Sequence, residues 1–150
     1  MNFKSQIATN INQSWKLLNL GLKPCTADMY LEKSKTPEYG EYHLHTICEG
    51  IDPEHWFSVR MNRDITPSWS LDRLLEIMPN HIDNYVLMYN RDYHSLTSDS
   101  VYIAYDSLHI PGEYMHKIDS CNNSYESCIE MIEWLIENNH LNKEYLKERL

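Results

Sequence analysis

The segment from Pro67 to Pro79 constrains the fold most, because it carries both a start signal and a stop signal for a helix. Ser70 can accept hydrogen bonds from the amides of the next turn as an N-cap residue. Trp69 precedes this cap and Leu74 stands at the fourth helical position, which is the spacing of a hydrophobic staple. The apolar face of the helix comprises Leu71, Leu74, Leu75 and Met78. We therefore predict a short helix that packs by this face and ends before Pro79.

A second helical pattern covers the region from about Lys4 to Leu20. Its apolar residues recur at spacings of three and four and predict one buried stripe; they are Ile7, Ile11, Trp15 and Leu18. Gly21 has the position of a left-handed residue in a Schellman ending, with Leu22 and Leu17 in apolar contact. Thr26 is expected to cap a short turn through Met29.

Period-two alternation predicts the first strand, and short segments between turn signals, several rich in aromatic and β-branched residues, predict the others. The ranges are 41–48, 55–61, 85–89, 101–105 and 114–118. The first two are expected to pair as a hairpin across Gly50 and Pro53. The connection between Asn90 and Ser100 is long for a hairpin. A last long helix is expected over residues 124–138, with Asn123 and Glu126 spaced as a capping box and Asn139 as the ending residue.

This order of elements predicts an α+β fold: a small, mainly antiparallel sheet of about four to five strands with helices packed on one face. The 150 residues fit a single domain, residues 1–150, and no repeat or linker divides them.

Charge and cysteine usage restrict the function and the location. With 13 basic and 22 acidic side chains the net charge is −9, which opposes binding to a nucleic-acid backbone. No apolar run is long enough to predict a membrane span. The four cysteines form no C-x-x-C pair and follow no secretory signal pattern, so we predict free thiols and a cytoplasmic location.

Three patches resemble a group of small uncharacterised proteins of Bacteroides-type bacteria and their phages and mobile elements. They are Leu20-Gly21-Leu22 with Pro24 and residues 26–29, the stretch 67–79, and the helical segment 129–135 with its Glu133-Trp134-Leu135 step. Together they follow one another along nearly the whole chain. The resemblance implies no assigned activity, so it transfers no catalytic or binding residue.

The best metal candidate is His43-x-His45-x-x-Cys48. On a strand the two imidazoles point to the same face, and imidazole with thiolate suits zinc. A closed site needs a fourth ligand, from Cys121 or Cys128. We favour the alternative that these histidines face solvent on an edge strand, and predict no metal and no cofactor.

No motif for nucleophilic catalysis or phosphate binding is present, because no serine stands in a G-x-S-x-G context and the four glycines are scattered. Cys128 falls on the apolar face of its helix and is expected in the core. The sequence therefore favours a protein that is not an enzyme.

The long C-terminal helix predicts a contact surface instead. Glu126, Glu130, Glu133 and Glu137 form an acidic ridge at helical spacing. Met131 and Trp134 lie at the flank of a broad apolar arc on the other side. Trp134 either packs under a loop as part of a wide core contact or binds a second subunit or partner.

We therefore predict a non-enzymatic protein-interaction domain, acting through a protein partner or as a homodimer, with neither nucleic acid nor membrane as partner. The alternative is a small enzyme or ligand-binding domain whose site is assembled around His43, His45 and the tyrosine-rich strands.

Overall fold

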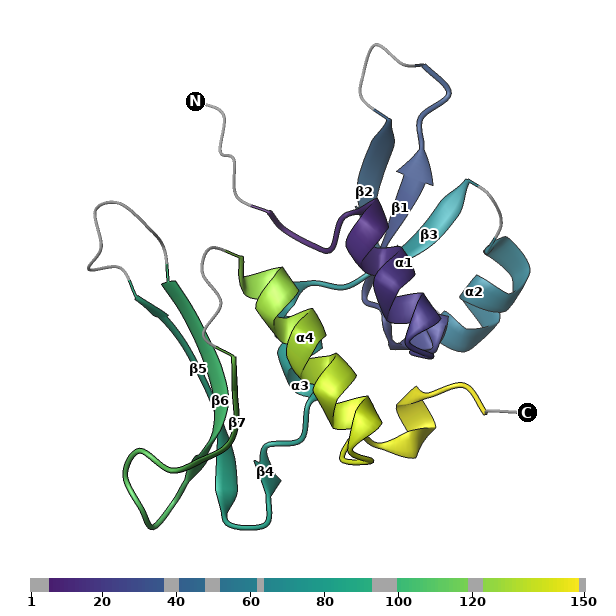
Figure 1. The fold of residues 1–150 in the computed structure, drawn as a ribbon. Coiled ribbons are helices and arrows are strands. Elements are labelled where there is room, and N and C mark those ends of the chain that lie inside the picture. The colour runs from purple at the N-terminus through teal and green to yellow at the C-terminus, as the bar shows by residue number, and fades with distance from the viewer. Residues whose placement is uncertain are drawn as a thin grey trace. The chain divides into compact units, whose positions relative to one another are not determined.

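The computed structural model describes residues 6–36, 41–47, 52–61, 64–92, 100–118 and 123–148. It divides the chain into two compact units (Figure 1). One unit contains residues up to 73 and takes the chain back from 143, and the other contains residues 74–142. The single domain over residues 1–150 stays a prediction, and each unit is described by itself.

The first unit is built on a three-stranded antiparallel sheet in the order β2-β1-β3. Its elements are α1 (Ile11–Asn19), the 3-10 helix η1 (Pro24–Thr26), β1 (Met29–Lys33), β2 (Tyr42–Thr46), α2 (Pro53–Arg60), β3 (Ile65–Ser68) and the 3-10 helix η3 (Lys143–Tyr145). Helix α1 packs against β3. The C-terminal segment belongs to this unit because Leu146 pairs with Leu22, and the Lys147 amide donates to the carbonyl of Gly21.

Helix α1 begins at Ile11, seven residues later than the sequence predicted from its apolar stripe. The reason is a capping box, in which the Asn10 side chain accepts from the amide of Gln13 while the Gln13 side chain accepts from the amide of Asn10. The predicted Schellman ending is confirmed. Gly21 has a φ of +104°, and the amide of Leu22 donates to the carbonyl of Leu17.

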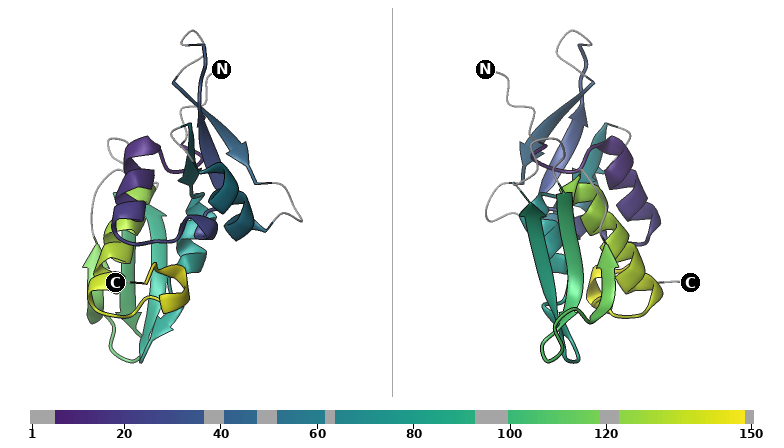
Figure 2. Two further views of the ribbon diagram at one scale, coloured as in Figure 1. Left: turned by 90° about the vertical axis from the view of Figure 1, so that its right-hand side faces the viewer. Right: turned by 60° about the vertical axis from the view of Figure 1, so that its left-hand side comes forward.

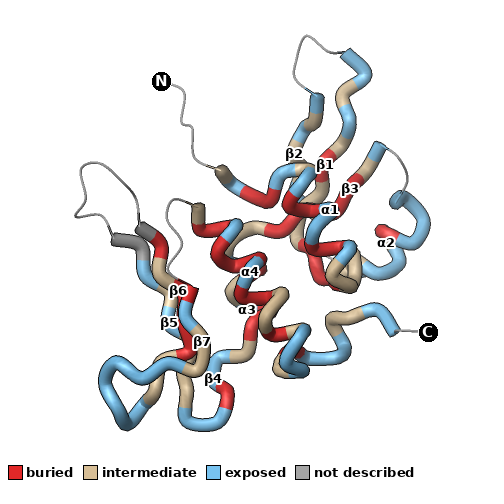
Figure 3. Tube along the Cα trace, in the orientation of Figure 1, coloured by how far each residue is buried: buried red, intermediate tan, exposed pale blue. Residues whose placement is uncertain are grey.

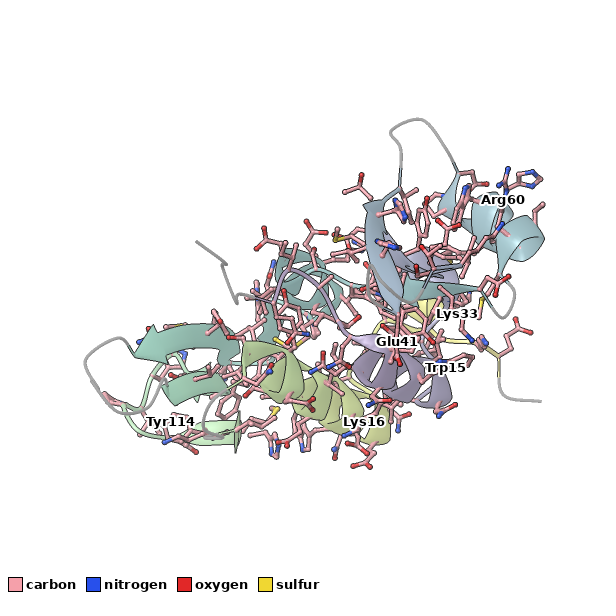
Figure 4. All side chains as sticks on the ribbon, turned by 90° about the horizontal axis from the view of Figure 1, so that it is seen from above. Trp15, Lys16, Lys33, Glu41, Arg60 and Tyr114 are labelled. Atoms are coloured by element: carbon pink, nitrogen blue, oxygen red, sulfur yellow. The ribbon has the colours of Figure 1, made fainter. Side chains whose placement is uncertain are left out.

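The predicted buried stripe of α1 is wrong for Ile7 and Trp15, whereas Leu18 is buried as predicted and Ile11 is half-buried. Ile7 lies before the helix and is 67% exposed, and Trp15 is 48% exposed (Figures 3 and 4). The face that the helix buries carries two polar residues, and its members are Gln13, Ser14, Leu17 and Leu18.

A buried network of hydroxyl groups lies beside this polar face of α1. The hydroxyl of Thr9 accepts from the backbone amide of Trp69 at 3.0 Å. It also lies 2.8 Å from the hydroxyl of Ser14 and 3.2 Å from that of Ser68. All four residues are buried. A buried polar group is stable only when its hydrogen bonds are made, so this network can replace the apolar contact that periodicity predicted.

Residues 53–60 form the helix α2, so the predicted strand over 55–61 and its hairpin are wrong. The Asp52 side chain accepts from the amide of Glu54, and Pro53 occupies the first turn, where its missing N–H costs nothing. The partner of β2 is β1 instead, with Tyr30 opposite His45. Strand β1 begins at Met29, within the segment that was predicted to be a turn.

Helix α3 (Leu71–Ile77) begins as predicted and crosses from the first unit into the second. The amide of Arg73 donates to the hydroxyl of Ser70 at 3.2 Å, which is an N-cap hydrogen bond. Ser70 is held in turn by Asp28, whose carboxylate accepts from both its amide and its hydroxyl. Asp28 thus attaches the start of α3 to the first unit.

Replacing Ser70 by alanine is expected to lower the free energy of unfolding by about 1–2 kcal/mol, because the N-cap and the hydroxyl contact to Asp28 are lost together. Urea titration followed by circular dichroism measures the effect. The control is Ser58→Ala, at an exposed serine of α2. Equal stability of Ser70→Ala and wild type would show that the cap does not stabilise the helix.

The second unit is a four-stranded antiparallel sheet in the order β4-β5-β6-β7, with α4 packed against β6 and β7 (Figures 1 and 2). Its elements are β4 (His81–Ile82), β5 (Tyr85–Asp92), β6 (Ser100–Ser107), β7 (Tyr114–Ile118) and α4 (Ser124–Glu137). The three strands predicted in this region are confirmed. The strands reach further into the predicted connection between Asn90 and Ser100, because β5 extends to Asp92 and β6 starts at Ser100. Residues 93–99 lie outside the described part.

Side chains alternate between the two faces of β6, and every second one faces α4. Val101, Ile103 and Tyr105 are almost fully buried there. The hydroxyl of Tyr105 donates to the carbonyl of Pro79, and that of Tyr89, on β5, donates to Ser124 of α4. The α4 N-cap is confirmed for Asn123, whose side chain accepts from two amides of the first turn.

The predicted α+β class and antiparallel pairing are confirmed. The strands are divided between two sheets, of three and four strands, where the sequence predicted one. The first sheet also carries helices on both faces. Helix α1 contacts β3 on one face, and the Trp56 ring of α2 contacts Tyr30 on the other.

Candidate functional site

The two histidines of the predicted metal motif share one face of the first sheet. Strand pairing places Glu32 opposite His43, and Tyr30 opposite His45. The Nε2 of His45 lies 3.2 Å from the Glu32 carboxylate, and the Nε2 of His43 lies 3.3 Å from the Ser34 hydroxyl. The prediction that both imidazoles point to the same face is therefore confirmed.

Within the described ranges, no three His, Cys, Asp or Glu side chains come together in a way that could hold a metal ion. Cys48 and Cys121 lie outside these ranges. Cys128 is fully buried on α4, and burial raises its pKa to about 12, which keeps the thiol protonated. The absence of a metal stays a prediction.

The same face carries a row of aromatic rings. The Tyr30 ring stacks on His45 with centroids 5.0 Å apart and contacts Trp56 at 4.6 Å, and Trp56 meets Phe57 edge to face. Trp56 is half-buried and Phe57 is buried. These contacts attach α2 to the sheet. The pair of His45 and Glu32 lies at the edge of the row, with side chains 42% and 47% exposed, so water reaches both groups and the contact stabilises little.

A nucleophilic triad is not assembled around Ser34. Its hydroxyl donates to the carbonyl of Thr36 and accepts from the amide of Thr36, which describes a local turn. Glu32, the carboxylate opposite His43 on β1, pairs with His45 instead. A triad needs nucleophile, base and carboxylate in one chain of hydrogen bonds.

The predicted acidic ridge lies on the surface of α4. Glu126, Glu130 and Glu137 are exposed, and Glu133 is half-buried. The structure therefore places these carboxylates where a partner can reach them.

The predicted apolar flank of α4 is mostly occupied within the second unit. Met131 is fully buried, so it cannot contribute to a contact surface in this conformation. Trp134 is half-buried. Its ring lies parallel to that of His116 at 4.5 Å, and the rings of His140 and Tyr105 lie 5.5 and 6.3 Å away. A dimer through Trp134 stays a prediction, with less free apolar surface than the helical pattern indicated.

Burial lowers the pKa of His116, and the nearby Glu130 carboxylate opposes this only partly. As pH falls below about 6.5, the unfolded chain takes up the proton before the folded chain does. The contribution of neutral His116 to stability is thus present above that pH and is lost as pH falls through the lowered pKa.

We therefore expect the free energy of unfolding of wild type to fall more steeply than that of His116→Gln between about pH 7.5 and pH 5. Urea titrations across this range measure it, and exposed His109→Gln is the matched control. Identical pH dependence of wild type and His116→Gln would contradict the expectation.

The net charge is confined to one unit. Residues 74–142 contain eleven Asp and Glu against two Lys and Arg, while the rest of the chain contains eleven of each. The second unit therefore carries the whole net charge of −9 and the first unit carries none. Sequence reasoning missed this because the chain was treated as one domain.

Comparison of the chain with protein-family models, curated proteins and solved structures finds no match. The resemblance to proteins of Bacteroides-type bacteria and their mobile elements stays a prediction. No helix in the described part of the chain is long and apolar enough to cross a membrane.

Proposed function

We propose that this chain is a non-enzymatic protein-interaction domain whose acidic unit, residues 74–142, binds a basic protein partner. The observation that carries the proposal is the confinement of the −9 charge to that unit. Such a charge steers a positively charged partner toward the unit and speeds their association. The proposal keeps the predicted cytoplasmic setting and, through the resemblance, a host among Bacteroides-type bacteria or their mobile elements.

The same charge argues against the homodimer that was predicted through α4. A two-fold contact would bring two units of nine excess negative charges together, with both acidic ridges at the rim. Like charges in contact reduce affinity. A partner of opposite charge avoids this cost, so we favour a different protein over a second copy.

Selection from a random peptide library with the full chain as bait tests the proposal. We expect enriched peptides to be rich in Lys and Arg, and their binding to weaken as salt rises from about 50 to about 200 mM. Glu130→Gln with Glu137→Gln should weaken binding. The matched control is Glu41→Gln with Glu54→Gln, at exposed glutamates of the first unit.

Enrichment of peptides without excess positive charge would contradict the proposal, as would equal loss of binding in both pairs of variants. The homodimer is tested separately, by sedimentation of the chain without peptide. A dimer at about micromolar concentration that weakens on Trp134→Ala would favour self-association instead.

A further inference from the structure

Strand β2 lies at the edge of the first sheet, and within the described residues its outer backbone groups have no partner (Figure 1). On its inner side, the amide of Ser34 donates to the carbonyl of Glu41, and the amide of Ile47 donates to the carbonyl of Asp28. An antiparallel ladder is hydrogen-bonded at every second position, so β1 bonds to the odd-numbered residues of β2. The backbone groups that point away from β1 belong to Tyr42, Leu44 and Thr46.

The other edges of the two described sheets carry features that hinder the addition of a strand. The amide of Lys33 donates to the carbonyl of Asp64, so the ladder turns the nitrogen of Pro67 on β3 outward, where it has no hydrogen to donate. Strand β4 has only two residues, and β7 pairs with β6 through a register shift beside Tyr105. Proline, short strands and irregular pairing protect sheet edges from other chains. The five residues of β2 include no proline, glycine, Lys, Arg, Asp or Glu.

A second copy of β2 matches all of these outer groups in one register. When two copies run antiparallel about a two-fold axis at Leu44, Leu44 lies opposite its own copy and Tyr42 lies opposite Thr46. Each outward amide then meets an outward carbonyl of the other strand. On one face of the new pair leucine contacts leucine, and on the other face His43 meets His45. The edge is therefore complementary to itself.

The charge of the first unit permits such a contact. Outside residues 74–142, eleven basic side chains balance eleven acidic ones, so the first unit has no net charge. The excess of nine negative charges belongs to the second unit. Pairing through β2 thus avoids the direct contact of like charges that disfavours a dimer through α4.

We propose that the edge of β2 is a self-association site, at which the β2 strands of two copies pair antiparallel about Leu44 and join two three-stranded sheets into one. This inference goes beyond the proposed function, because it concerns the first unit and requires no basic partner. A five-residue edge buries little surface, so the dissociation constant is on the order of 100 μM. The dimer would present two acidic units to a partner with two basic segments, which increases avidity.

Sedimentation of the full chain between about 10 μM and about 1 mM measures the association. Thr46→Pro removes an outward amide at an exposed position without removing a hydrogen bond to β1, so it should weaken the dimer about tenfold or more. The matched control is Thr46→Val, which keeps the amide and should stay within about twofold of wild type. Trp134→Ala should leave this association unchanged, which distinguishes it from a dimer through α4.

Solvent exchange of the backbone amides, measured by NMR at both ends of this concentration range, tests the register without any substitution. Exchange should slow severalfold at the higher concentration for the amides of Tyr42, Leu44 and Thr46. The amides of His43 and His45, which already bond to β1, should not change.

A wild-type chain that stays monomeric at about 1 mM would overturn this inference. A dimer that Thr46→Pro and Thr46→Val weaken equally, or one in which exchange slows outside β2 alone, would overturn it as well. The proposed function is unaffected by these outcomes, because its test depends on the binding of basic peptides.

Discussion

Trp69→Ala is expected to lower the free energy of unfolding by about 3–5 kcal/mol, the usual cost of truncating a buried aromatic side chain to alanine. Trp69 is fully buried, and its indole Nε1 donates to the Thr26 hydroxyl at 3.0 Å. The substitution therefore leaves a cavity and a buried hydroxyl with one hydrogen bond fewer. The Thr26 hydroxyl keeps its bond to the carbonyl of Lys23.

Trp15→Ala is the control for the same substitution in the same unit. Trp15 is 48% exposed on α1, so its removal should change stability by no more than about 0.5 kcal/mol. Urea titration followed by circular dichroism measures both variants without relying on tryptophan fluorescence. Equal loss of stability in the two variants would contradict the burial that distinguishes them.

Thr9→Val is expected to lower the free energy of unfolding by about 2–4 kcal/mol although it hardly changes the side-chain volume. The threonine hydroxyl accepts from the amide of Trp69 and contacts the hydroxyls of Ser14 and Ser68. Valine would leave this buried amide without its side-chain acceptor. The cost is the desolvation of groups that lose their partners.

The matched control is Thr46→Val, at an exposed position of β2, where water replaces any lost hydrogen bond. Chemical denaturation of both variants gives the comparison. Stability of Thr9→Val equal to that of wild type would mean that the hydroxyl network does not stabilise the first unit.

Local signals in the sequence predicted the parts of the fold that local interactions determine. The N-caps at Ser70 and Asn123 and the left-handed Gly21 depend on residues within one turn, and all three are confirmed. Strands β5, β6 and β7 were predicted from short segments between turn signals, of which the first two are aromatic and β-branched, and all three are confirmed.

The mistakes arose where polar residues determine the structure. Counting apolar periodicity placed Trp15 in the buried stripe, while the structure leaves Trp15 48% exposed and buries Ser14 beside it. Ser14 is buried because Thr9, on the preceding segment, provides its hydrogen bond. Helix α2 was predicted as a strand because the start signal of Asp52 and Pro53 was read as a hairpin turn. Met131 was placed at the flank of the broad apolar arc of α4, but the structure buries it fully.

The most direct test of the proposed interaction is the change in amide chemical shifts of the 15N-labelled chain when a selected basic peptide is added. The account predicts that the largest changes fall within residues 74–142, with smaller ones on residues 6–73. Because a bound peptide alters the amides that it covers, the affected residues locate the contact surface directly. Changes concentrated on α1 or on the histidine face of the first sheet would contradict the account, as would a spectrum unchanged by saturating peptide.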